Sequence, residues 1–244
     1  MTTLSSPPTE QLKERSGRRL RDLTALTGGL FVLGAVGAFV IGGDTPDGNA
    51  SADAVIAHYT ANRTQGIIAA IVLALTAIPT LAFAARLRER ARIALGADRT
   101  LPNLAFGAGV LTAAGFLGAA AIDLALADYA RDLELSAAQA LNALGADSFL
   151  LFTTGIATLV LAGSLIAIRS RLLPAWLGWT GIAIAIAMFT PVGFFAACLA
   201  GVWIVAASLL LFARGEPSTD GGGSDRVMVA GTTADADLTP TFSS

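Results

Sequence analysis

Asp123 is the residue whose type and position most suggest chemistry. It is the first of three carboxylates in AAAIDLALADYARD, residues 119–132, and it interrupts the end of a long apolar run before the chain turns polar. A carboxylate among apolar neighbours can bind a cation, carry a proton or pair with a basic side chain. His58, Tyr59 and Arg63 lie just before the preceding apolar run and are the closest candidates to share a polar site with it.

The composition places these residues in a membrane protein. Apolar residues make up 54% of the 244 and charged residues 14%, and the mean hydropathy is +0.67. Six apolar segments approach the roughly 20 residues that a helix needs to cross the hydrocarbon layer. They lie at about 23–42, 65–85, 104–126, 148–168, 172–190 and 192–213. The last two are separated only by a tight turn, so one long kinked helix, and five spans in all, is the alternative.

Helices are the open-ended elements that satisfy their own backbone hydrogen bonds in lipid. The sequence therefore predicts an all-α bundle of six transmembrane helices over 23–213. A basic N-terminal tail, 1–22, precedes it. A polar C-terminal tail, 214–244, follows and is expected to be disordered, because it has little apolar surface to bury.

The basic residues predict the orientation, since Lys and Arg near span ends favour the cytoplasmic side. With both termini cytoplasmic, fourteen of the sixteen basic residues fall inside, and only Arg63 and Arg131 fall outside. This favours an even number of spans in a multi-pass protein of the cell membrane. The two long outer loops, 43–64 and 128–147, are each expected to hold a short amphipathic helix, capped by Ser51 and Ser136.

The helical face of Asp123 is predicted to point into the bundle. Residues three and four positions apart share a helix face, and this face carries Ala119, Phe116 and Gly115. Small residues favour helix–helix contact over lipid contact. We therefore expect Asp123 to pair with Arg63, with His58 and Tyr59 nearby, in an outward-facing polar pocket. The pair is either a salt bridge that locks two helices or part of a ligand or proton site.

No other residue pattern indicates catalysis or a cofactor. His58 is the single histidine and Cys198 the single cysteine, which excludes multi-histidine haem and zinc sites and multi-cysteine metal sites. We expect no catalytic residues, no metal, no cofactor and no nucleic-acid partner.

Two further groups of residues are interpreted as membrane contacts. The cluster RLRERAR holds Arg86, Arg88, Arg90 and Arg92. It either binds anionic lipids at the cytoplasmic face or is the ordinary positive flank of a helix. Trp176 and Trp179 have the amphipathic rings typical of interface anchors.

Small residues also recur at four-residue spacing in the spans, as at Gly34 and Ala38, and at Gly181 and Ala185. Such spacing allows helix backbones to approach closely. It predicts close packing within the chain, or contact with a second copy or another membrane protein.

The segments around Tyr59, Asn62 and Arg63, the arginine-rich end of the second span and LPAWLGW at 173–179 together resemble a domain-of-unknown-function family of bacterial six-span membrane proteins. The resemblance covers about 20–213. It implies the six-span architecture, and it carries no catalytic residue across, because the family has no established activity.

Two functional hypotheses follow from the sequence. The first is a non-enzymatic membrane protein that organises the envelope or serves as a partner subunit. The second is a small transporter or ligand sensor whose pocket contains Asp123 and Arg63. An enzyme acting on lipid is a third possibility.

Overall fold

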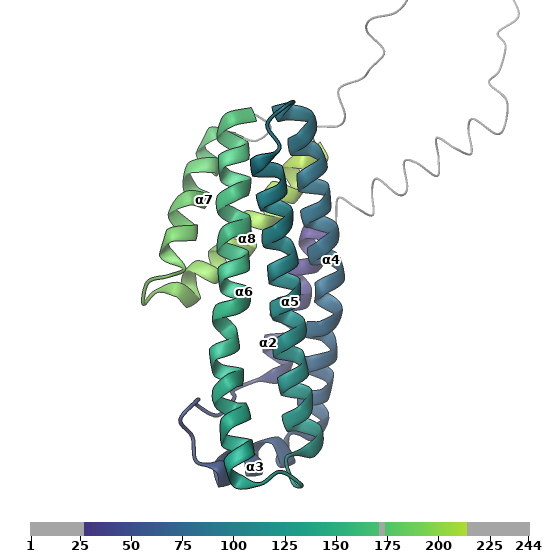
Figure 1. Ribbon diagram of the computed structural model, residues 1–244, viewed down its shortest axis with the longest axis vertical. Helices are drawn as coiled ribbons and strands as arrows, with labels where there is room; N and C mark the ends of the chain where they lie inside the picture. Colours follow the sequence, from purple (N-terminus) through teal and green to yellow (C-terminus); the bar gives the residue numbers. More distant parts are fainter. Residues whose placement is uncertain (1–26, 171–173, 214–244) are drawn as a thin grey trace, which may run out of the picture. The chain divides into compact units, whose positions relative to one another are not determined.

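The computed structural model describes residues 27–170 and 174–213, and the regular secondary structure within these ranges is all α-helix (Figure 1). The expected tails, 1–22 and 214–244, lie outside the described residues. The helices are α2 (Thr27–Gly42), α3 (Ala52–Ala61), α4 (Arg63–Leu95), α5 (Thr100–Tyr129), α6 (Leu135–Ser170), α7 (Ala175–Ala187) and α8 (Gly193–Ala213).

Four of these helices, α4, α5, α6 and α8, are long and apolar enough to cross a membrane. The described parts of the other two apolar helices are shorter, with 16 residues in α2 and 13 in α7. At 1.5 Å per residue α7 covers about 20 Å, less than the roughly 30 Å of hydrocarbon. Each of the six apolar segments thus contributes a helix within the described residues, and four of these helices have the length of a span.

The three longest helices, α4, α5 and α6, run side by side, and α3 lies across one end of them (Figure 1). That end is called the α3 end below. Helix α2 packs on α4, and α7 packs on α6 and ends part-way along it (Figure 1). The shared core of these helices is built from alanine and a few large side chains, among them Phe116, Phe152 and Trp203.

Glycines set the close spacing of these helices. A Cβ atom on Gly115 of α5 would lie 2.8 Å from the backbone nitrogen of Phe152 on α6. One on Gly155 of α6 would lie 2.6 Å from the backbone nitrogen of Thr112. Gly34 faces Thr76, and Gly181 faces Ser164 and Trp203. These glycines therefore face neighbouring helices of the same chain at close range.

The expected loop helices have different outcomes. The helix after Ser51 is confirmed as α3, whose first turn is capped by the Ser51 hydroxyl, and both Val55 and Tyr59 are buried. The expected separate short helix over SAAQALNAL, 136–144 in the outer loop 128–147, is wrong, because α6 runs unbroken from Leu135 to Ser170. No proline interrupts this segment, and one glycine inside a helix costs only about 1 kcal/mol, so two helical segments join into one.

The three tryptophans divide between the surface and the core. Trp176 and Trp179 on α7 are 60% and 65% exposed. Trp203 of α8 is buried, and its indole N–H donates a hydrogen bond of 2.8 Å to the carbonyl oxygen of Leu177. Trp203 therefore joins α8 to the first turn of α7.

Candidate functional site

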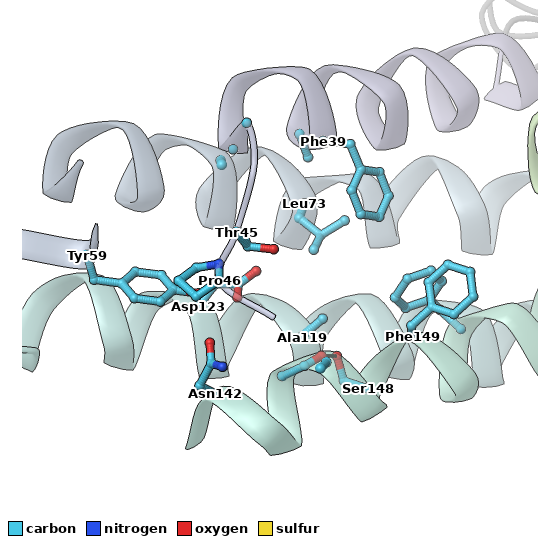
Figure 2. A pocket seen from close by; sticks show the side chains of 17 residues that line it. Phe39, Thr45, Pro46, Tyr59, Leu73, Ala119, Asp123, Asn142, Ser148 and Phe149 are labelled. Atoms are coloured by element: carbon cyan, nitrogen blue, oxygen red, sulfur yellow. Dashed lines mark hydrogen bonds between the residues drawn. The ribbon is translucent and has the colours of Figure 1, made fainter. Parts of the chain in front are cut away.

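A cavity of about 250 Å³ lies between the helices near the α3 end (Figure 2). Its walls come from the end of α2, the loop that follows it, and parts of α3, α4, α5 and α6. Protein interiors are close-packed, and voids larger than a water molecule are few. A cavity of this size is therefore the first place to look for a bound molecule.

Among the described residues that line the cavity, Asp123 supplies the one charged side chain. It comes from the last two turns of α5 and lies on the packed face that also carries Ala119 and Phe116. Among the described residues, no side chain forms an ion pair or a hydrogen bond with its carboxylate. Asp123 is half-buried, so its carboxylate can still accept a hydrogen bond from a molecule that enters the cavity.

Tyr59 closes the cavity from the α3 side, with its ring directed toward Asp123 (Figure 2). The side chain is 6% exposed. Burial, and secondly the negative charge of Asp123, raise the pKa of the Tyr59 hydroxyl to about 12. The hydroxyl therefore stays neutral at physiological pH, and within the described parts of the chain it forms no hydrogen bond.

Asn142 forms a polar part of the wall and holds a neighbouring loop in place. It is buried in α6, and its side-chain amide donates a hydrogen bond of 2.7 Å to the carbonyl oxygen of Asp47. This bond ties the loop between α2 and α3 to α6. The Ser148 hydroxyl, which also lines the cavity, donates to the carbonyl oxygen of Gly145 at 2.6 Å.

Three phenylalanines form the opposite, apolar part of the lining. Phe39 comes from α2, and Phe149 and Phe152 come from α6. The ring of Phe152 lies 5.2 Å from that of Phe149 and 6.1 Å from that of Phe39, measured between centroids. These rings and Asn142 could not be predicted from the sequence, because nothing local distinguishes them from other core residues.

Arg63 does not pair with Asp123, so the expected salt bridge is wrong. The Arg63 guanidinium instead donates to the carboxylate of Asp128, one turn further toward the end of α5, and both side chains are well exposed. Arg63 is also absent from the cavity lining.

The register of α4 and α5 gives the reason. Gly66 lies against Ala127, and Gly109 against Ala84. Extending this register sets Arg63 level with residue 130 and Asp123 level with residue 70. Arg63 and Asp123 are thus separated by about 10 Å along the helix axis, at a rise of 1.5 Å per residue.

His58 lies beside the site without lining it. Its ring meets the ring of Tyr59 edge-on, with 5.2 Å between centroids, and it is absent from the cavity lining. His58 therefore supports the position of Tyr59 and makes no direct contact with the cavity.

The arginine cluster occupies the far end of α4. The side chain of Arg88 donates to the amide oxygen of Asn103 at 3.1 Å and lies over the ring of Phe106. Arg86 is exposed, and Arg90 and Arg92 are partly buried. Arg88 thus fastens α4 to α5, and Arg86 is the most accessible of the four.

The described residues contain no group of three His, Cys, Asp or Glu side chains that could hold a metal ion. The cavity combines one unpaired carboxylate, one neutral phenol and several aromatic rings. This chemistry suits reversible binding of a small molecule.

No family model, no curated protein and no solved structure matches this chain.

Proposed function

We propose that this protein is an integral membrane protein that binds a small molecule in the cavity at the α3 end, as a ligand sensor or small transporter does. The observation that carries the proposal is the Asp123 carboxylate, which lines the cavity without a partner among the described residues. Binding without chemical conversion is favoured, because no nucleophile–base pair accompanies Asp123 in the lining.

Size and charge support a bound molecule. The cavity of about 250 Å³ has room for several water molecules or one small molecule. A ligand that contacts Asp123 would give its carboxylate the charge-assisted partner that the described side chains do not provide.

The proposal includes a topology. The α3 end faces outward, the arginine cluster faces the cytoplasm, both termini are cytoplasmic, and α2 and α7 complete six spans. The fourteen basic residues on one side and two on the other support this arrangement. In it the cavity opens toward the extracytoplasmic side, and Arg86, Arg88, Arg90 and Arg92 face anionic lipids.

A cavity-filling variant tests the proposal. Ala119 lines the cavity, whereas Ala121 on the same helix is exposed. The full chain is purified in detergent, and its melting temperature is measured with a panel of small cationic, neutral and anionic compounds. We expect at least one compound to stabilise the wild type and Ala121→Leu and to have no effect on Ala119→Leu. The proposal fails if no compound stabilises the wild type, or if the stabilisation persists in Ala119→Leu.

A structural role as a partner subunit is the second candidate, and α2 provides the observation that favours it. Cβ atoms on Gly29 and Gly37 would meet nothing within 4 Å, so this side of α2 is open to another membrane helix. Native mass spectrometry of the wild type and of Gly37→Leu tests this role. An oligomer that dissociates in the variant supports it, and a wild-type monomer contradicts the self-association form.

A further inference from the structure

We infer that the ligand is a small organic cation, whose ammonium group binds the Asp123 carboxylate while its apolar part packs on the phenylalanine rings. This inference rests on the proposed function, since it names the ligand class for the same cavity.

Charge is the first argument. The part of the cavity lining that the structure describes contains no Lys, Arg or His side chain to neutralise Asp123. The nearest basic residue on α4, Arg63, is already paired with Asp128. A monocation in the cavity gains a charge-assisted hydrogen bond to Asp123, whereas an anion is repelled.

The lining also distinguishes an organic cation from a metal ion. Ca²⁺ takes about six to eight oxygen ligands, and the cavity offers one carboxylate. No three acidic, histidine or cysteine side chains gather anywhere in the described ranges. An ammonium group needs only a few acceptors, and the Asp123 carboxylate and the Tyr59 hydroxyl supply them.

The aromatic lining is the second argument. Aromatic ring faces attract cations within about 6 Å, and Tyr59, Phe39, Phe149 and Phe152 place four rings around the cavity (Figure 2). Because three of these rings lack a polar atom, they also bind an aliphatic or aromatic body. The lining is thus polar at Asp123, Tyr59 and Asn142 and apolar at the phenylalanines, which matches an amphipathic amine.

Size limits the ligand further. The cavity, at about 250 Å³, lies below the roughly 300–1,000 Å³ typical of sites for drug-sized ligands. The ligand is therefore a small amine, or the ammonium headgroup of a lipid whose chains remain outside the cavity.

The test uses three probes of one shape, benzylamine, benzyl alcohol and benzoate, with the purified full chain in nanodiscs. We expect benzylamine to bind the wild type more tightly than the other two. Asp123→Asn keeps the side-chain shape and should weaken benzylamine binding by roughly 10- to 100-fold. Asp128→Asn, on the same helix but outside the cavity, should leave it unchanged. Phe149→Leu should also weaken benzylamine binding. This variant tests the contribution of an aromatic ring without changing the charge of the cavity.

The outcomes separate this inference from the proposed function. If benzyl alcohol binds as tightly as benzylamine and Asp123→Asn has no effect, while Ala119→Leu abolishes binding, then the cavity binds a ligand that is not a cation. If Ala119→Leu leaves binding intact, the cavity itself is not the site. Nanodiscs with and without phosphatidylethanolamine identify the source of the ammonium group. If benzylamine binds more weakly in nanodiscs with phosphatidylethanolamine, the lipid headgroup competes for the cavity and is the source of the ammonium group. If benzylamine binds equally in both, the ligand is a free amine.

Discussion

The Tyr59 ring and the Asp123 carboxylate line the same cavity, although the whole of α4 separates their helices in the sequence. Asp123 is close enough for its charge to raise the pKa of the Tyr59 hydroxyl, in addition to the larger effect of burial. The short helix α3 thus closes a site whose acidic group belongs to α5.

Alkaline titration can detect this relationship. The chain has two tyrosines, and Tyr129 is exposed, so Tyr129→Phe leaves Tyr59 as the only tyrosine. Its absorbance change should occur near pH 12, and not near the usual value of about 10. Asp123→Asn should lower this pKa while leaving it above about 10, because burial remains. A Tyr59 that ionises near pH 10 in folded Tyr129→Phe contradicts the structure.

The same shift predicts how stability depends on pH. In the unfolded chain Tyr59 ionises near pH 10, whereas in the folded chain it ionises at about 12. Above pH 10 the folded state therefore holds more protons, so its stability falls as pH rises toward 12, by up to about 2–3 kcal/mol. Chemical unfolding of Tyr129→Phe at pH 9 and pH 12 measures the loss. Tyr59→Phe in that background should show a smaller loss.

The ion pair between Arg63 and Asp128 is expected to contribute little. Their side chains are 57% and 36% exposed, and exposed pairs contribute about 0.2–1 kcal/mol in double-mutant cycles. A cycle with Arg63→Ala and Asp128→Asn should give a coupling free energy in that range. The matched cycle with Arg63→Ala and Asp123→Asn should be additive. A coupling free energy found only in the cycle of Arg63→Ala with Asp123→Asn would indicate that Arg63 pairs with Asp123, as the sequence suggested.

The sequence was informative about Asp123 and its helix face, because helical periodicity is a local property. The small residues one turn away, such as Ala119, correctly indicated the packed face. The partner of Asp123 was not predictable in this way. Pairing depends on the axial register of α4 and α5, which close contacts such as Gly109 on Ala84 determine, and hydropathy does not encode that register.

Glycine contacts give a prediction about stability. On α5, a Cβ on Gly115 would clash with the Phe152 backbone, whereas one on Gly118 would meet open space. Gly115→Ala should lower the free energy of unfolding by about 1–3 kcal/mol, because the helices must separate. Gly118→Ala should be neutral or stabilising by up to about 1 kcal/mol, from helix propensity. Unfolding in mixed micelles compares the two, and equal effects would argue against the close α5–α6 contact.

Cysteine labelling tests the proposed topology. Cys198, the single cysteine, is first replaced by alanine. Single cysteines are then introduced at the exposed positions Ala57 on α3 and Ala94 at the end of α4. A membrane-impermeant maleimide should label Ala57→Cys in intact cells and Ala94→Cys only after lysis. The reverse pattern would place the cavity on the cytoplasmic side.

The phenylalanine rings of the cavity and the length of α6 could not be predicted from the sequence. Phe39 and Phe149 belong to different apolar segments, and only the packing of α2 near α6 brings their rings to one cavity. The polar segment at 136–147 resembles a loop helix by composition, yet no breaker separates it from the apolar segment that follows. Composition thus predicts which segments are helical, whereas tertiary packing decides where they join and meet.

A crystal structure of the full chain with 4-bromobenzylamine tests most directly whether the cavity at the α3 end binds a small organic cation, because anomalous scattering locates the bromine. We expect one bromine peak in the cavity among Phe39, Phe149 and Phe152, with the amine directed at Asp123. Bromine found only on the lipid-facing surface, with none in the cavity, would contradict it.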